Sequence, residues 1–119
     1  MLPTCLVYAT TINETESQLC DAYKYALIQS LRAPVEKGIQ SIYKDDKHAP
    51  ESLSWDAYDT EVLQIRQLYG VGGSYEITLK IKPCYRAHIT YGVDEITIRS
   101  DGTLIRYEHL KTYPIVDFN

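Results

Sequence analysis

Apolar and polar residues alternate in the last third of the chain, on both sides of a tight-turn signal at Ser100-Asp101-Gly102-Thr103. Asp-Gly tolerates the positive φ angles of a two-residue type I′ turn, so the sequence predicts a hairpin of strands 93–99 and 104–110. In this register Ile98 faces Ile105, and Asp94 faces His109. The other predicted pairs are Arg99 with Leu104, Thr97 with Arg106, Ile96 with Tyr107, and Glu95 with Glu108. The isoleucines and Tyr107 then share a core face, which Asp94 and His109 continue toward the end of the sheet.

Two more strands are predicted upstream, at 59–69 and 74–83, joined by a hairpin turn at Gly70-Val-Gly-Gly73. The second of them alternates cleanly between a core face and a water face, as in an antiparallel sheet that is covered on one side. Its core-facing residues are Tyr75, Ile77, Leu79 and Ile81, and its water-facing residues are Glu76, Thr78, Lys80 and Lys82. The first strand is ambiguous, because Leu63 and Ile65 lie on one face and Val62 and Leu68 on the other.

Helical spacing of apolar residues precedes the strands. Asn13 and Glu16 form a capping box, which predicts a helix start. The residues that then follow helical spacing are Leu19, Tyr23, Ala26, Leu27, Ser30 and Leu31. Pro34 ends or kinks this helix, and a second short helix with Val35, Ile39 and Ile42 inward is predicted to begin there.

These elements predict an α+β fold in which two N-terminal helices pack on one face of a four-stranded antiparallel meander sheet. Residues 10–119 form a single domain. A cystatin-like or nuclear-transport-factor-like arrangement is suggested by fold-level analogy alone.

The composition indicates which classes of partner and ligand the chain can bind. The net charge is −4 without a basic run, which disfavours nucleic acid as a partner, and no apolar stretch approaches the ~20 residues that span a bilayer. Eleven tyrosines stand against one phenylalanine, so either amphipathic packing or an aromatic binding surface is expected. The three cysteines show no zinc spacing, and neither a metal nor a cofactor is predicted. By alternation Cys84 lies on the charged, water-facing side of the second strand, unless Pro83 interrupts the alternation. This position favours free thiols over a disulfide between Cys84 and Cys20.

The N-terminus is apolar from Met1 to Ala9 and polar from Thr10 onward. Val7-Tyr8-Ala9 is typical of a small-residue cleavage site, so residues 1–9 are interpreted as a signal-peptide remnant. The alternative is an ordinary N-terminal strand. The first interpretation predicts a secreted or cell-envelope protein, and the second a cytoplasmic one.

The predicted pair of Asp94 and His109 is the sharpest candidate for chemistry, because a carboxylate can orient an imidazole as a general base or a ligand. His88 and Tyr91 lie in the segment that enters the same strand, so a pocket of these four residues is a hypothesis. The alternative is a hydrogen-bonded polar pair that closes the sheet. The facing Glu95 and Glu108 are interpreted as part of a charged, solvated surface rather than a cation site.

Several motifs of the last third occur together. They are Ala87-His88, Gly92-Val-Asp-Glu-Ile-Thr-Ile-Arg99, Asp101-Gly102 and Tyr107-Glu108-His109. This run resembles a bacterial family known as domain of unknown function 3888, and the likeness extends from the helix near Leu19 to His109. The resemblance implies short exported proteins of spore-forming bacteria, and it implies no activity. Where family members continue past the histidine into a proline-bearing loop, this chain has Ile89-Thr90.

Three functional hypotheses follow. The first is a non-enzymatic exported binding module for a protein or a cell-envelope component, acting through the loop from Pro83 to Gly92. The second is a small enzyme or ligand-binding pocket around Asp94 and His109, and the third is assembly through an exposed edge strand. A cavity that reaches His109 would favour the pocket, whereas a flat rim with exposed tyrosines would favour the binding module.

Overall fold

The computed structural model describes residues 16–116. The proposed signal remnant at residues 1–9 and the capping residue Asn13 lie outside the described residues. Two helices, α1 (Glu16–Ser30) and α2 (Arg32–Tyr43), are followed by a short 3₁₀ helix, η1 (Ala57–Asp59). The strands are β1 (Glu61–Leu68), β2 (Ser74–Ile81), β3 (Cys84–Tyr85), β4 (Ile89–Thr90), β5 (Gly92–Arg99) and β6 (Leu104–Thr112).

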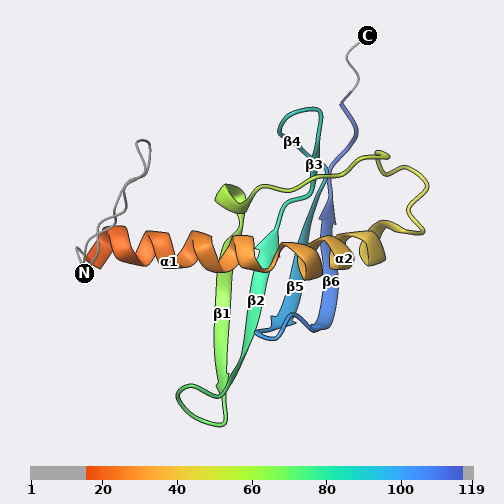
Figure 1. Cartoon of the computed structure of the whole chain (residues 1–119). Helices are drawn as coiled ribbons and strands as arrows, with labels where there is room; N and C mark the ends of the chain where they lie inside the picture. Colours follow the sequence, from red (N-terminus) through yellow and green to blue (C-terminus); the bar gives the residue numbers. More distant parts are fainter. Residues whose placement is uncertain (1–15, 117–119) are drawn as a thin grey trace.

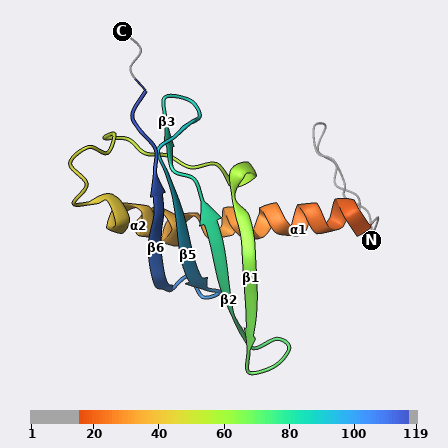
Figure 2. The same cartoon turned by 180° about the vertical axis from the view of Figure 1, so that it is seen from behind.

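The four long strands form one antiparallel sheet in the order β1-β2-β5-β6. The helices α1 and α2 run almost end to end across one face of this sheet (Figure 1). Seen from behind, the other face has no helix over it in the described part of the chain (Figure 2). The predicted α+β fold is therefore confirmed. The sequence prediction missed the small β3–β4 hairpin, which interrupts the meander between β2 and β5.

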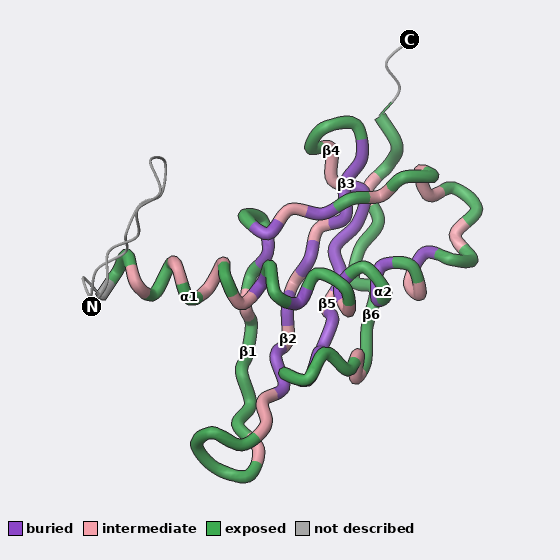
Figure 3. Tube along the Cα trace, in the orientation of Figure 1, coloured by how far each residue is buried: buried purple, intermediate pink, exposed green. Residues whose placement is uncertain are grey.

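The core lies between α2 and the two central strands (Figure 3). Its fully buried side chains include Ile28, Val35, Ile77, Leu79, Ile81, Ile96 and Ile98. Gly38 faces the sheet, and a Cβ atom on it would lie 2.8 Å from Cδ1 of Ile96. The missing side chain thus lets α2 approach β5 closely, which brings the C-terminal end of α2 near the strand that carries Asp94.

The predicted helix stripe is partly wrong. Val35 and Ile39 are buried as expected, but the fully buried residue of α1 is Ile28, while Tyr23 is 66% exposed and Ala26 is exposed. The first half of α1 extends beyond β1, where none of the described strands lies beneath it (Figure 1). The second helix begins at Arg32, so Pro34 lies in its first turn, where a backbone N–H has no intrahelical acceptor.

The predicted β5–β6 turn is also corrected. The Gly102 N–H donates to the Arg99 carbonyl at 2.8 Å, and Gly102 is the turn residue with a positive φ, 95°. A four-residue turn followed by a glycine bulge replaces the two-residue type I′ turn, so Ile98 pairs with Leu104 instead of Ile105. The pairs from Thr97–Arg106 to Asp94–His109 are confirmed, because a β-bulge between Thr97 and Ile98, with Ile105 as the extra residue of β6, restores the predicted register. Tyr107 is 45% exposed rather than buried, since β6 is an edge strand.

A second bulge resolves the ambiguity of β1. It lies between Val62 and Gln64, so that Val62 pairs with Leu79 and Ile65 with Ile77, and both therefore face the helices. Pro83 does interrupt the alternation after β2, and Cys84 is buried in β3 instead of lying on the charged face. Cys20 is exposed on α1, and both cysteines are free thiols.

Candidate functional site

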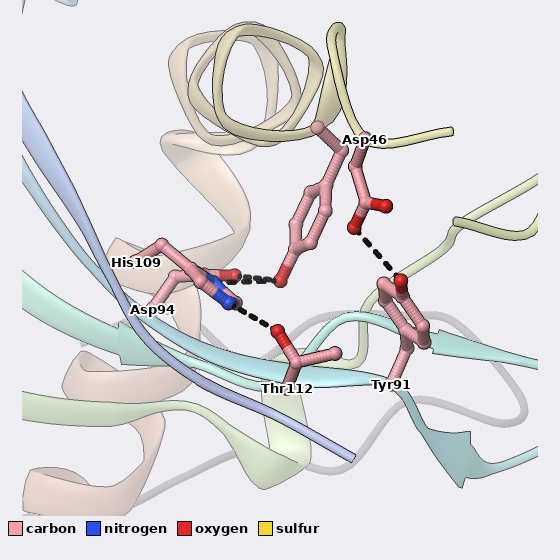
Figure 4. Close-up of polar contacts among 6 residues, drawn as sticks. Asp46, Tyr91, Asp94, His109 and Thr112 are labelled. Atoms are coloured by element: carbon pink, nitrogen blue, oxygen red, sulfur yellow. Dashed lines mark hydrogen bonds and ion pairs between the residues drawn. The ribbon is translucent and has the colours of Figure 1, made fainter. Parts of the chain in front are cut away.

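Asp94 is the centre of a buried polar network. Its side chain is fully buried in β5, where its neighbour across the strand pair is His109 of β6. His109 Nδ1 lies 2.5 Å from Asp94 Oδ1, and the Tyr43 hydroxyl donates to Asp94 Oδ2 at 2.6 Å. Figure 4 shows the aspartate and the imidazole side by side, with α2 above them. Both carboxylate oxygens are thus satisfied although water does not reach them.

Burial dominates the electrostatics of this network. Removal from water raises the pKa of Asp94 above its ordinary value of 3.8, and the hydrogen bonds from Tyr43 and His109 only partly oppose this effect. Burial, together with the neighbouring Asp94 carboxylate, also raises the pKa of Tyr43. The tyrosine hydroxyl therefore stays protonated and acts as a fixed donor to Asp94.

His109 links the buried carboxylate to the surface. Its Nε2 lies 2.6 Å from Oγ1 of Thr112, on the ring side opposite Asp94 (Figure 4). A β-bulge makes this contact possible: Val93 pairs with Lys111 and Asp94 with His109, so Leu110 is the extra residue, and His109 and Thr112 share a face. With the proton on Nδ1 beside Asp94, Nε2 accepts from Thr112. This Asp–His–hydroxyl order is the arrangement of a proton relay.

Tyr91 belongs to a neighbouring pair. It is almost fully buried, and its hydroxyl donates to Asp46 Oδ2 at 2.7 Å, while its ring centroid lies 5.6 Å from that of Tyr43. Burial, and next the hydrogen bond to Asp46, raise the pKa of Tyr91 to about 12. The same hydrogen bond lowers the pKa of Asp46. Tyr91 thus supports Tyr43 through ring contact and ties the loop after α2 to the start of β5.

His88 does not join the other three predicted residues. It is exposed at the tip of the β3–β4 hairpin, and within residues 16–116 no hydrogen bond or ion pair connects it to them. The two residues before it, Arg86 and Ala87, have positive φ angles of 45° and 72°. This strained tip is the exposed part of the Pro83–Gly92 segment, because Pro83, Cys84 and Tyr85 are buried.

Sequence reasoning missed three residues of the network, namely Tyr43, Asp46 and Thr112. Tyr43 lies four positions after Ile39 and thus continues the apolar stripe of α2, which is a signal that could have been used. Thr112 could not be found without the bulge, because strict alternation from His109 would select Lys111 for the same face. Asp46 lies in a loop with no periodic pattern.

Among the hollows on the described surface are four that His109 does not line. The largest, about 410 Å³, lies between the end of α2 and the following loop, and its walls include Tyr43 and Asp46. A second, about 370 Å³, lies on the sheet face opposite the helices. A third, about 250 Å³, is almost entirely apolar and lies between α1 and β1; we call it the α1–β1 groove. Its walls are Cys20, Tyr23, Lys24, Leu27, Val62 and Ile65.

Residues 16–116 contain no group of three or more histidine, cysteine or acidic side chains placed to hold a metal ion. None of the helices in this range has the length and apolar character needed to cross a membrane.

The family model for a protein of unknown function, DUF3888, matches residues 23–111. The chain belongs to this family. The matched range includes Tyr43, the Asp94–His109 pair and all the residues that line the hollow on the sheet face opposite the helices. Thr112 lies one residue beyond it. Neither the curated proteins nor the solved structures include a match to the chain.

Proposed function

We propose that this chain is a non-enzymatic binding module, exported to the cell envelope or out of the cell, that captures an extended segment of a partner protein along β1. The observation that carries the proposal is the outer edge of β1, which has no strand beside it in residues 16–116 and lies next to the α1–β1 groove. Exposed tyrosines also favour a binding module over a pocket at His109, since Tyr23, Tyr58 and Tyr69 are exposed and His109 lines none of the four hollows described above.

The edge of β1 supplies the main-chain part of such an interaction. β1 is the first strand of the sheet, so one side of it pairs with β2 and the other side has no strand beside it in the described part of the chain. An extended peptide can add there as a further strand, with main-chain hydrogen bonds giving affinity. β1 is eight residues long, and the main-chain N–H and C=O groups of alternate residues point away from β2.

The groove supplies the side-chain part. Ile65 is 52% exposed and lines the groove, and Leu63, at the β1 bulge, is 47% exposed. Alternate side chains of an added strand would point toward α1, where Tyr23 and Leu27 form the opposite wall. Because these walls are apolar, apolar side chains at every second position of the partner segment are expected to give specificity.

The export part of the proposal rests on the apolar stretch from Met1 to Ala9 and the polar sequence that follows. It can be tested in the bacterium that carries the gene, by determining the N-terminal residue of the protein in the cells and in the medium by mass spectrometry. Cleavage after Ala9 supports export, while an intact chain confined to the cell contradicts it.

The binding surface can be tested with peptides selected from a random library displayed against the folded protein. We expect the selected peptides to protect β1 amides from hydrogen exchange and to bind Ile65→Lys about tenfold more weakly, because a charge would be buried in the groove. Leu110→Lys, on the opposite edge of the sheet, is the matched control. Peptides that bind both variants equally would contradict the proposal, as would self-association through β1 that excludes every peptide.

A second candidate function is a small hydrolytic enzyme at Asp94, His109 and Thr112, favoured by the 2.6 Å contact between His109 Nε2 and the threonine hydroxyl. The relay would let the imidazole take the hydroxyl proton as Thr112 Oγ1 attacks the carbonyl carbon of an ester. The imidazolium would then protonate the departing alcohol as the ester C–O bond breaks, and water would hydrolyse the acyl-threonine and restore the hydroxyl. Turnover of an activated ester is the test. Loss of activity in His109→Gln but not in His88→Gln supports this function, and equal rates in both variants exclude it.

A further inference from the structure

The open face of the sheet carries a polar hollow that neither the binding edge nor the Asp94 network uses. Two cross-strand rows meet there: Gln64 pairs with Thr78, Thr78 with Thr97, and Thr97 with Arg106, while Arg66 pairs with Glu76, and Glu76 with Arg99. The hollow has a volume of about 370 Å³, and none of the helices in residues 16–116 lies over this face (Figure 2). Its walls are Gln64, Arg66, Glu76, Thr78 and Arg106.

One carboxylate on this surface is already neutralised. The Glu76 side chain is 8% exposed, and its oxygens lie 2.9 Å from Arg66 Nη2 and 3.7 Å from Arg99 Nη2. The hydrogen bond from Arg66 and the nearby arginines hold the pKa of Glu76 below its ordinary value. Glu76 is therefore ionised at neutral pH, and it balances only one of the three guanidinium groups around it.

Two of the arginines around Glu76 have N–H groups without an acceptor among the described residues. In residues 16–116, the Arg106 side chain makes no hydrogen bond or ion pair, although it lines the hollow, and Arg99 Nε is buried without an acceptor. An unpaired guanidinium in a concave polar surface suits an oxyanion, because its planar set of N–H groups matches two oxygens of a carboxylate or phosphate.

We propose that this hollow binds an acidic sugar, with its carboxylate or phosphate held by Arg106 and Arg66 and its hydroxyls held by Gln64 and Thr78. The amide of Gln64 both donates and accepts hydrogen bonds. The hydroxyls of Thr78 and Thr97 lie 3.0 Å apart, so one donates to the other and the accepting one keeps its own hydrogen for a ligand. The volume is in the range of small-molecule sites.

The neighbouring row limits the ligand charge. Lys80, Glu95 and Glu108 follow across the same face, and Glu95 and Glu108 face each other directly. Two adjacent carboxylates repel a second anionic group but accept hydrogen bonds from neutral hydroxyls. The face is thus suited to a ligand with a single acidic group at the arginine end and hydroxyls elsewhere, rather than to a polyanion.

The test is an NMR titration of the full chain with glucuronate, glucose 6-phosphate and glucose in separate arms, at low ionic strength. We expect saturable binding of at least one acidic sugar, with shifts confined to the open face, and about tenfold weaker binding of neutral glucose. If only glucuronate binds, the acidic group of the ligand is a carboxylate, and if only glucose 6-phosphate binds, it is a phosphate. Equal binding of glucose, or no saturable binding of either acidic sugar, would overturn the proposal.

Variants decide whether the hollow itself is responsible. Arg106→Gln should weaken binding about tenfold and Gln64→Ala by less, because a charge-assisted hydrogen bond is stronger than a neutral one. Arg32→Gln, an exposed arginine of α2, is the control and should bind like the parent. An equal loss in the Arg32 variant would indicate attraction to net charge and contradict the site. Ile65→Lys should keep acidic-sugar binding, which separates this result from that of the β1 edge.

Discussion

The Tyr43 hydroxyl donates to Asp94 Oδ2 at 2.6 Å, and this bond joins the last residue of α2 to the centre of the sheet across 51 positions of sequence. Together with His109 it leaves neither oxygen of a fully buried carboxylate without a partner. Loss of a partner at such a buried group costs more than the bond contributed, since the group that remains cannot return to water.

Tyr43→Phe is therefore expected to lower the free energy of unfolding by about 1–3 kcal/mol, because Asp94 Oδ2 loses its donor while the ring packing is kept. Urea unfolding measures the change. Tyr58→Phe is the matched control, since Tyr58 is 77% exposed and its hydroxyl faces water. Equal stability of the two variants would show that the buried hydrogen bond contributes nothing.

Gly92→Ala should act through the same hydroxyl. A Cβ atom at Gly92 would overlap the Tyr43 hydroxyl and would lie 3.2 Å from Cε1 of His109. We expect this variant to be destabilised, and less so in a Tyr43→Phe background, where the overlapping oxygen is absent. A double-mutant cycle measured by urea unfolding should give a coupling energy of about 0.5–3 kcal/mol. Additive effects would mean that the alanine methyl group is accommodated without moving Tyr43.

The pairing of Asp94 with His109 could be predicted from the sequence because a short turn and a period of two determine which residues face each other. The prediction survived an error in the turn type, since a β-bulge between Thr97 and Ile98, at which Ile105 is the extra residue of β6, absorbed the one-residue difference. A bulge also explains why Thr112 could not be predicted. Leu110 is the extra residue of another bulge, so the residues of β6 beyond it point to the opposite faces from those that strict alternation predicts. Bulges depend on packing against both neighbouring layers, and a local pattern does not contain that information.

The helix stripe was predicted less well than the strands. Apolar spacing shows which residues can face a core, but it does not show where the sheet ends beneath the helix. Tyr23 has suitable spacing but is 66% exposed, while Ile28 is fully buried in the core, and the first half of α1 continues beyond β1 (Figure 1). The same overhang creates the α1–β1 groove, so the failed part of the prediction coincides with the proposed binding surface.

The two described cysteines should differ in reactivity. Cys20 is exposed on α1, while Cys84 is buried in β3, with its sulfur 3.6 Å from the Ser54 hydroxyl. In a Cys5→Ser background, one thiol should react rapidly with a disulfide reagent in native protein, and the second only when the fold opens. Cys20→Ser should abolish the fast phase and Cys84→Ser the slow phase. Two fast thiols would contradict the burial of Cys84.

The raised pKa of Asp94 predicts the sign of its contribution to the pH dependence of stability. The folded protein binds the Asp94 proton more tightly than the unfolded chain does, because burial raises the pKa above 3.8. The resulting stabilisation is complete below pH ~3.9, the value of an unfolded aspartate, and is lost as the pH rises through the folded pKa. Only Tyr43 and His109 oppose the shift, through their hydrogen bonds to Asp94. Urea unfolding of the parent and of Asp94→Asn should therefore give a stability difference, parent minus variant, that falls as the pH increases from about 4. A difference that grows with pH would mean that the hydrogen bonds of Tyr43 and His109 outweigh burial.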